Sequence, residues 1–166
     1  MGVCAIRIDE RLIHGQVATL WQGTWNCNRI MVIDEKSAND PMLKSVLKIA
    51  CPTGVRLSVL EAPTAAANLN SGKYGRERIT IVTKTPANLL TLIENGYTPE
   101  CDITVGNMSG GAGKQKIGKH ISVTPQDIED FRKLDSMNLK LYSQTVPSET
   151  PTPFIRMMED ALANAR

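Results

Sequence analysis

The chain has 166 residues, of which 42% are hydrophobic and 22% are charged, a composition typical of one globular domain. A domain of this size buries roughly 70% of the surface that its unfolded chain exposes, so we expect residues 1–166 to fold as a single unit without disulfide bonds. The formal net charge is only +2 and no dense block of Lys and Arg occurs, which argues against a nucleic-acid partner.

The first predicted element is a strand over residues 3–8, built from apolar and β-favouring residues. A charged stretch follows, and after Gly15 apolar residues recur at spacings of three and four, which predicts a helix. The helix face expected to pack inward contains Val17, Leu20, Trp21, Thr24 and Trp25. We interpret its two tryptophans as core residues rather than as a stacking platform for a ligand. His14 therefore lies where the first strand passes into the first helix.

Strands and helices continue to alternate along the chain. Short apolar runs predict strands over residues 29–33, 55–60, 78–82, 102–105 and 139–142. The predicted helices begin at Asp40-Pro41, cover residues 61–69, begin at Thr85-Pro86, and cover residues 126–136 and 154–163. In the helix after Asp40, the apolar face expected inside is Met42, Leu43, Val46, Leu47 and Ala50. This alternation predicts an α/β fold with an open, mainly parallel, doubly wound sheet of about six or seven strands and helices on both faces.

Residues 114–123 depart from this alternation, because apolar and polar residues alternate there with no helix between strands. We expect this segment to be a strand at the edge of the sheet. His120 lies on this segment among lysines, and His14 is the other of the two histidines in the chain. Without an H-E-x-x-H or similar spacing, we interpret His120 as part of a solvated strand face and predict no metal site.

The four cysteines lie far apart, and none forms a C-x-x-C pair: Cys4, Cys27, Cys51 and Cys101. We interpret all four as reduced thiols, which favours a cytoplasmic protein. The N-terminus lacks a basic region followed by an apolar run, so we expect no secretory signal. No stretch approaches the roughly 18 apolar residues of a membrane span.

The end of the first strand has the residues of an anion site. Ligands of open parallel sheets bind at the carboxyl edge of the strands, where helix-start amides favour negative charge. His14 has Arg11 three residues before it, and Gly15 and Gln16 contribute the amides that open the helix. We predict a phosphoryl site in which His14 is the nucleophile, Arg11 binds phosphate oxygens and Asp9 orients Arg11 or the imidazole. The alternative is a histidine that is only structural or exposed.

The segment RIDERLIHGQVATLW closely resembles the phosphorylation-site segment of IIB components of the bacterial sugar phosphotransferase system, in the mannose/fructose/sorbose family. The likeness extends over nearly the whole chain and includes the ANDP segment near Asp40 and the KTPAN segment after Thr83. It also includes the VGNMSGG segment that starts at Val105. Because the family usually shows N-V-G-G-M there, this loop departs from the family pattern.

The resemblance implies that His14 carries a phosphoryl group on Nδ1 and that Arg11 contacts the phosphate. The implied donor is a phosphohistidine on a IIA domain or protein, and the implied acceptor is a sugar hydroxyl presented by membrane IIC and IID components. The implied location is the cytoplasm, in peripheral contact with the membrane permease, and no cofactor is implied. If the family's strand order holds, the loop after the fourth strand lies beside His14, so Lys84 and Thr85 are further candidates for phosphate contact.

Two apolar residues beside the site, Leu12 and Ile13, leave two interpretations open. They are candidates for docking both protein partners, or they pack beneath the loop. The residues do not identify the sugar, and they leave the oligomeric state open, a homo-oligomer included.

A glycine-rich loop, Gly110-Gly111-Ala112-Gly113-Lys114, resembles a phosphate-binding loop without matching its pattern. That pattern requires glycine and Ser/Thr where this chain has Met108 and Gln115. We interpret the segment as a flexible loop near the strand edge. The alternatives to phosphotransfer are therefore a nucleotide- or phosphate-binding α/β module built around this loop, and a regulatory domain that reuses the fold.

Overall fold

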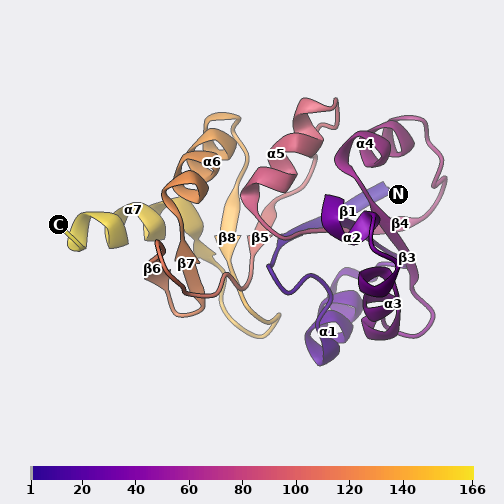
Figure 1. The fold of residues 1–166 in the computed structure, drawn as a ribbon, viewed down its shortest axis with the longest axis horizontal. Helices are drawn as coiled ribbons and strands as arrows, with labels where there is room; N and C mark the ends of the chain where they lie inside the picture. Colours follow the sequence, from indigo (N-terminus) through magenta and orange to yellow (C-terminus); the bar gives the residue numbers. More distant parts are fainter. Residues whose placement is uncertain (1) are drawn as a thin grey trace.

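A seven-stranded sheet forms the centre of the protein in a computed structural model that describes residues 2–166 (Figure 1). Its strand order is β3-β2-β4-β1-β5-β8-β9, and all neighbours are parallel except β8 and β9. The strands are β1 (Gly2–Ile8), β2 (Arg29–Ile33), β3 (Arg56–Leu60), β4 (Arg78–Thr83), β5 (Ile103–Val105), β8 (Leu141–Ser143) and β9 (Thr152–Pro153). The predicted mainly parallel α/β sheet is confirmed.

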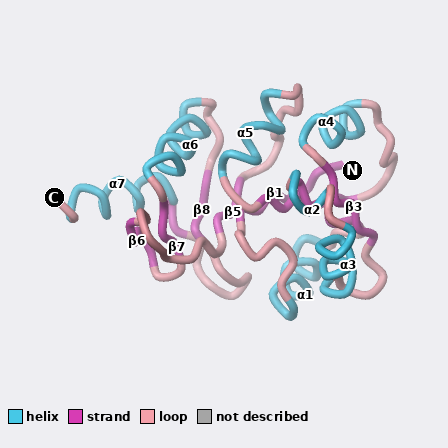
Figure 2. Tube along the Cα trace, viewed as in Figure 1, coloured by secondary structure: helices cyan, strands magenta, loops and turns pink. Residues whose placement is uncertain are grey.

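Helices cover both faces of this sheet, as Figures 1 and 2 show. They are α1 (Gly15–Trp25), α2 (Glu35–Ala38), α3 (Pro41–Ala50), α4 (Ala62–Asn70), α5 (Pro86–Glu94), α6 (Pro125–Ser136) and α7 (Phe154–Asn164). Helices α1 and α3 lie on one side of the strands, and α4, α5 and α6 lie on the other. The expected cap of α3 is confirmed, because the Asp40 carboxylate accepts hydrogen bonds from the amides of Met42 and Leu43.

Alternate residues of one strand enter two separate hydrophobic clusters, one on each face. In β2, Ile30 and Val32 pack with Leu47 of α3, whereas Met31 and Ile33 join the larger cluster under α4, α5 and α6. A parallel sheet buried on both faces reads as a continuous apolar run, which is why residues 29–33 were recognisable as a strand. The sheet is therefore a rigid support for the loops at its carboxyl edge.

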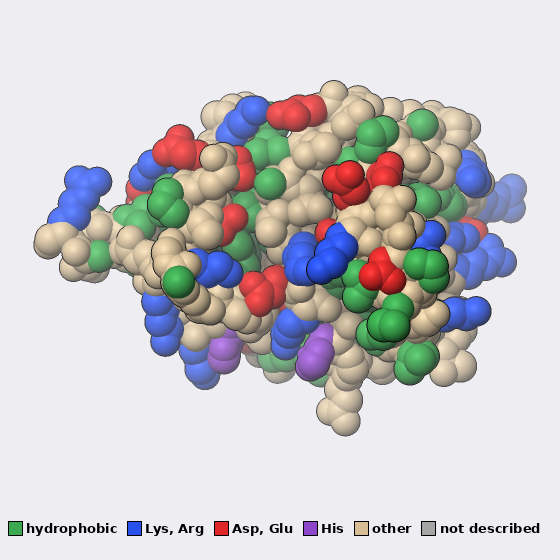
Figure 3. All heavy atoms as spheres, viewed as in Figure 1, with side chains coloured by type: hydrophobic (Ala, Val, Ile, Leu, Met, Phe, Trp, Pro, Cys, Tyr) green, Lys and Arg blue, Asp and Glu red, His purple; other side chains and the backbone are tan. Residues whose placement is uncertain are grey.

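The expected inward faces of α1 and α3 are partly wrong. Leu20 of α1 is half exposed, and three apolar side chains of α3 point largely to solvent: Met42 at 74%, Val46 at 57% and Ile49 at 85% exposed. Figure 3 shows hydrophobic side chains gathered over α3. Because α3 covers the outer strand β3, only its flank with Leu47 packs on the sheet. The apolar stripe of α3 is consequently wider than its contact with the core.

Residues 114–123 were wrongly expected to form a strand at the edge of the sheet. They form a separate antiparallel hairpin, β6 (Gln115–Gly118) and β7 (Ile121–Val123), which turns at Lys119 and His120 (Figure 2). A two-residue period is the same in one strand and in two short strands of a hairpin, so the pattern alone could not separate them. On the side of the sheet beyond β5 the edge strand is β9, which pairs with β8. Within residues 2–166, no helix combines the length and the apolar character that crossing a bilayer requires.

Candidate functional site

His14 is exposed at the carboxyl edge of the sheet, where it is the N-cap residue of α1. Its strand, β1, lies between β4 and β5, so the loops after all three strands meet at this edge (Figure 1). Among residues 2–166 no side chain caps α1, and the first turn of this helix contains no acidic residue. The first-turn amides of Gly15 and Gln16 are therefore available to an anion beside the imidazole. Gly15 has φ +42°, a left-handed conformation that glycine adopts without strain.

The expected contact between Asp9 and Arg11 is present. Arg11 Nε donates to Asp9 Oδ1 at 3.0 Å, Arg11 Nη2 donates to Oδ2 at 2.9 Å, and the Arg11 amide donates to Oδ1 at 3.0 Å. This pairing raises the pKa of Arg11. Arg11 keeps 26% of its side chain exposed, and its Nη1 makes no hydrogen bond to the described protein. Asp9 therefore holds the guanidinium through Nε and Nη2 and leaves Nη1 unengaged among residues 2–166.

Arg7 is a buried member of the same network that no spacing in the sequence indicates. Its Nη2 lies 3.2 Å from Asp9 Oδ2, and its two terminal nitrogens donate to the carbonyls of Gln144 and Thr145 at 2.9 and 3.0 Å. Its guanidinium also lies over the Trp21 ring, 4.8 Å from the centroid. Burial lowers the pKa of Arg7, and the charge of Asp9 opposes that shift. Arg7 thus ties β1 to the segment after β8 and fixes the carboxylate that holds Arg11.

The predicted core position of Trp21 is confirmed: the side chain is buried and stacks on Trp25 with ring centroids 4.3 Å apart. Its indole nitrogen donates to the Thr145 carbonyl at 3.1 Å.

Ile13 is buried in the cluster under α1, and Leu12 packs against it. For Ile13 the structure favours packing beneath the loop over docking of a partner.

The loop after β5 packs against the other side of the site. The Glu10 amide donates to the Asn107 carbonyl at 2.9 Å, and Lys114 Nζ lies 3.7 Å from Glu10 Oε2 and 2.9 Å from the Ser109 carbonyl. Burial alone would raise the pKa of Glu10, but hydrogen bonding with Ser109 and the Lys114 ammonium outweigh it and lower that pKa. The glycine-rich segment therefore braces the His14 loop through Lys114.

Gly106 lies directly after β5, where the backbone comes close to the buried Arg7–Asp9 ion pair. A Cβ atom at this position would lie 2.1 Å from Arg7 Nη2 and 2.7 Å from Asp9 Oδ2. Only glycine leaves room for the Arg7–Asp9 pair. The sequence contained a signal for this position, since a glycine directly after a buried strand often marks close approach.

Gly106→Ala is expected to destabilise the protein by about 1–3 kcal/mol, because the new methyl group must displace the buried guanidinium. For a chain of this length that corresponds to a fall in Tm of about 2–12 °C, measurable by calorimetry. Gly111→Ala is the matched control, because its Cβ would meet nothing within 4 Å. Equal melting temperatures for both variants would contradict the close-packing argument.

Lys84 and Thr85 follow β4, the neighbour of β1, but nothing joins them to His14 in the described structure. Lys84 is exposed, and the Thr85 hydroxyl caps α5, which lies on the face opposite α1.

His120 lies in the β6–β7 turn, on the separate hairpin. Within residues 2–166, no group of three or more His, Cys, Asp or Glu side chains is placed to hold a metal ion.

Comparison with known proteins gives one consistent family. The family model described as PTS system sorbose subfamily IIB component matches residues 3–165. The chain is 33% identical over 149 residues to the sorbose-specific EIIB component of Klebsiella pneumoniae, covering 90% of each chain. It is 34% identical over 159 residues to the mannose-specific EIIAB component of Escherichia coli K12, covering 96% of this chain and 48% of that relative. The crystal structure of the IIBSor domain of the K. pneumoniae sorbose permease superposes with a TM-score of 0.91 at 31% identity, covering 96% and 98% of the two chains.

Proposed function

The chain belongs to the sorbose subfamily of IIB components of the sugar phosphotransferase system, and from that premise we propose that His14 is the residue that carries the phosphoryl group. The family makes the chain a phosphotransferase component in sugar transport. The observation that supports His14 is its position: an exposed residue at the start of α1, three residues after an arginine that Asp9 holds. We propose residues 1–166 as one IIB domain.

The chemistry at His14 is two successive in-line displacements. An unprotonated imidazole nitrogen, Nδ1 by family resemblance, attacks the phosphorus of a phosphohistidine on a IIA protein, so one N–P bond forms as another breaks. In the second step a sugar hydroxyl attacks, an O–P bond forms, the His14 N–P bond breaks and the hydroxyl proton passes to the released imidazole. The amides of Gly15 and Gln16 and the free edge of Arg11 would bind the equatorial oxygens, where negative charge must be neutralised. Asp9 acts through Arg11 by holding that edge in place. Lys84 and Thr85 remain candidates from the neighbouring loop.

The proposed partners are a IIA phosphodonor and the membrane IIC and IID components. One relative carries the designation EIIAB, which supports transfer between an A and a B unit. We propose that the chain works in the cytoplasm at the face of the permease. The proposed acceptor is a sugar, and relatives of similar identity are named for sorbose and for mannose.

Incubation with phosphoenolpyruvate, the general phosphotransfer proteins and a cognate IIA protein is expected to phosphorylate the chain. Because phosphoramidate bonds hydrolyse in acid and survive base, the label should be acid-labile and base-stable. Phosphopeptide mapping should place it on the peptide that contains His14. A label stable in acid, or one on another peptide, would reject the proposal.

Arg11→Ala is expected to slow phosphoryl transfer by about 10–100-fold, because one charged contact to the transferring group is lost. The helix start and Asp9 remain, so the variant should still fold, as judged by circular dichroism. Transfer is measured as the initial rate of labelling from the phosphorylated IIA protein. Arg156→Ala is the control, because that exposed arginine lies on α7, far along the chain from the site. An unchanged rate in Arg11→Ala would remove Arg11 from the mechanism.

A further inference from the structure

Strand β3 leaves one edge of the seven-stranded sheet open. It is the last strand on its side and pairs only with β2. The Arg56 amide donates to Asn28 and the Leu60 carbonyl accepts from Asp34, so the backbone groups of residues 56, 58 and 60 face β2. Those of Leu57 and Val59 consequently face outward, and no described residue pairs with them. An open edge of this kind is a template for another strand.

A groove runs along this edge between β3 and α3. It has a volume of about 760 Å³, and its apolar lining comes from Cys51, Val55, Leu57 and Val59. Leu57 and Val59 turn their side chains toward α3, where they pack against the cluster that contains Leu47. A strand edge beside a helix, with apolar residues between them, is the geometry of domains that bind peptides by adding a strand.

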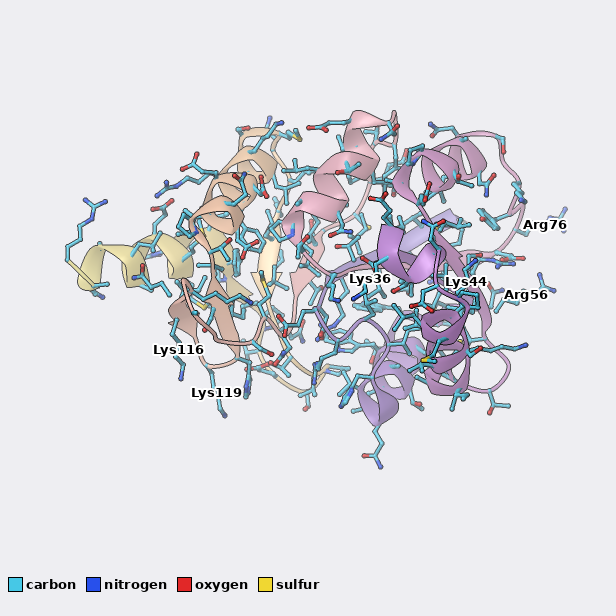
Figure 4. The ribbon with its side chains drawn as sticks, in the orientation of Figure 1. Lys36, Lys44, Arg56, Arg76, Lys116 and Lys119 are labelled. Carbon is cyan, nitrogen blue, oxygen red and sulfur yellow. The ribbon has the colours of Figure 1, made fainter. Side chains whose placement is uncertain are left out.

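Cations line the groove. Lys44 and Lys48 of α3, Arg29 of β2 and Arg56 of β3 all contribute to its wall. One carboxylate, Glu77, pairs with both arginines, and Arg56 stays mostly exposed. Neither lysine forms a salt bridge among the residues that the structure describes. Figure 4 shows Lys44 and Arg56 on this end of the molecule and Lys116 at the other.

From these observations we propose that the groove between α3 and the open edge of β3 binds an extended acidic segment of a partner protein as an added strand. Main-chain hydrogen bonds would form with Leu57 and Val59, apolar side chains would fill the groove, and carboxylates would meet Lys44, Lys48 and Arg56. A second copy of this chain is a poor occupant, because edge-to-edge pairing would bring the same cations together. The groove lies at the outer strand, so occupation does not depend on His14.

A capped seven-residue peptide of alternating glutamate and valine, labelled with fluorescein, tests the proposal by fluorescence anisotropy. We expect saturable binding that weakens as salt rises, and no binding by the matched lysine–valine peptide. Lys44→Glu/Lys48→Glu should weaken binding by about tenfold or more, because two attractions become repulsions. Lys116→Glu, with the same charge change at the other end of the molecule, should bind like the wild type. Equal losses in both charge variants would overturn the proposal.

Val59→Pro tests strand addition separately from charge. It removes an outward N–H that the sheet does not use, so an edge strand should tolerate it. Peptide binding is expected to weaken about fivefold through the lost hydrogen bond. Unchanged binding in this variant, if circular dichroism shows it folded, would overturn strand addition. A salt-sensitive dimer through this face in sedimentation, or binding of vesicles with 25% anionic lipid in the absence of peptide binding, would also overturn the proposal.

Discussion

His14→Ala is expected to abolish phosphorylation by the IIA donor, lowering the rate of labelling by more than about a thousandfold. The carrier step needs a nitrogen that forms a bond to phosphorus, and neither alanine nor the surrounding amides and guanidinium can replace it. The fold should survive, because the imidazole is exposed and caps α1 only through its backbone carbonyl, which accepts from the Ala18 amide at 3.3 Å. Stability should change by no more than about 0.5 kcal/mol.

His120→Ala is the control for this experiment, because the chain contains two histidines and this is the other. His120 lies exposed in the β6–β7 turn, and its replacement should leave the rate of labelling unchanged. Circular dichroism and calorimetry on both variants separate loss of the acceptor from loss of the fold. Acid-labile label that persists in a folded His14→Ala variant would place the phosphoryl group elsewhere.

How far the sequence predicts this fold depends on whether an element's pattern is local. Residues 29–33 form β2 as expected, because a strand buried on both faces is a continuous apolar run. The exposed side chains of α3 were not predictable in this way. Periodicity shows that a helix has an apolar stripe. How much of that stripe packs on the sheet depends on where the helix lies, and α3 lies over an outer strand.

The same distinction between local and distant contacts applies to the residues of the candidate site. His14, Arg11 and Asp9 lie within six residues of one another, so the sequence could place them together at one strand end. Arg7 binds carbonyls 137 and 138 residues away, and no spacing rule reports such a contact. The available signal was an arginine among the apolar residues of a predicted strand, since that residue type is almost never buried without partners.

Asp9→Ala is expected to be the most destabilising change in the site, by about 3–5 kcal/mol. The Asp9 side chain is 3% exposed and accepts hydrogen bonds from Arg7 and Arg11, one of which is buried with it. Its removal leaves the Arg7 guanidinium buried without a counter-charge. For a chain of this length the expected fall in Tm is about 6–20 °C by calorimetry. Asp9→Asn is the matched variant, since it keeps the shape and one acceptor but removes the charge.

A second comparison separates the two roles that we assign to Asp9. Arg7→Met/Asp9→Leu replaces the buried ion pair by apolar side chains, a change that often costs little stability. This double variant should recover much of the Tm lost in Asp9→Ala. Phosphoryl transfer through His14 should still be slow, because Arg11 then lacks the carboxylate that holds it. If stability and transfer rate recovered together, Asp9 would serve only to neutralise Arg7. If only stability recovered, the carboxylate would also be needed to hold the Arg11 guanidinium where it can meet a phosphoryl group on His14.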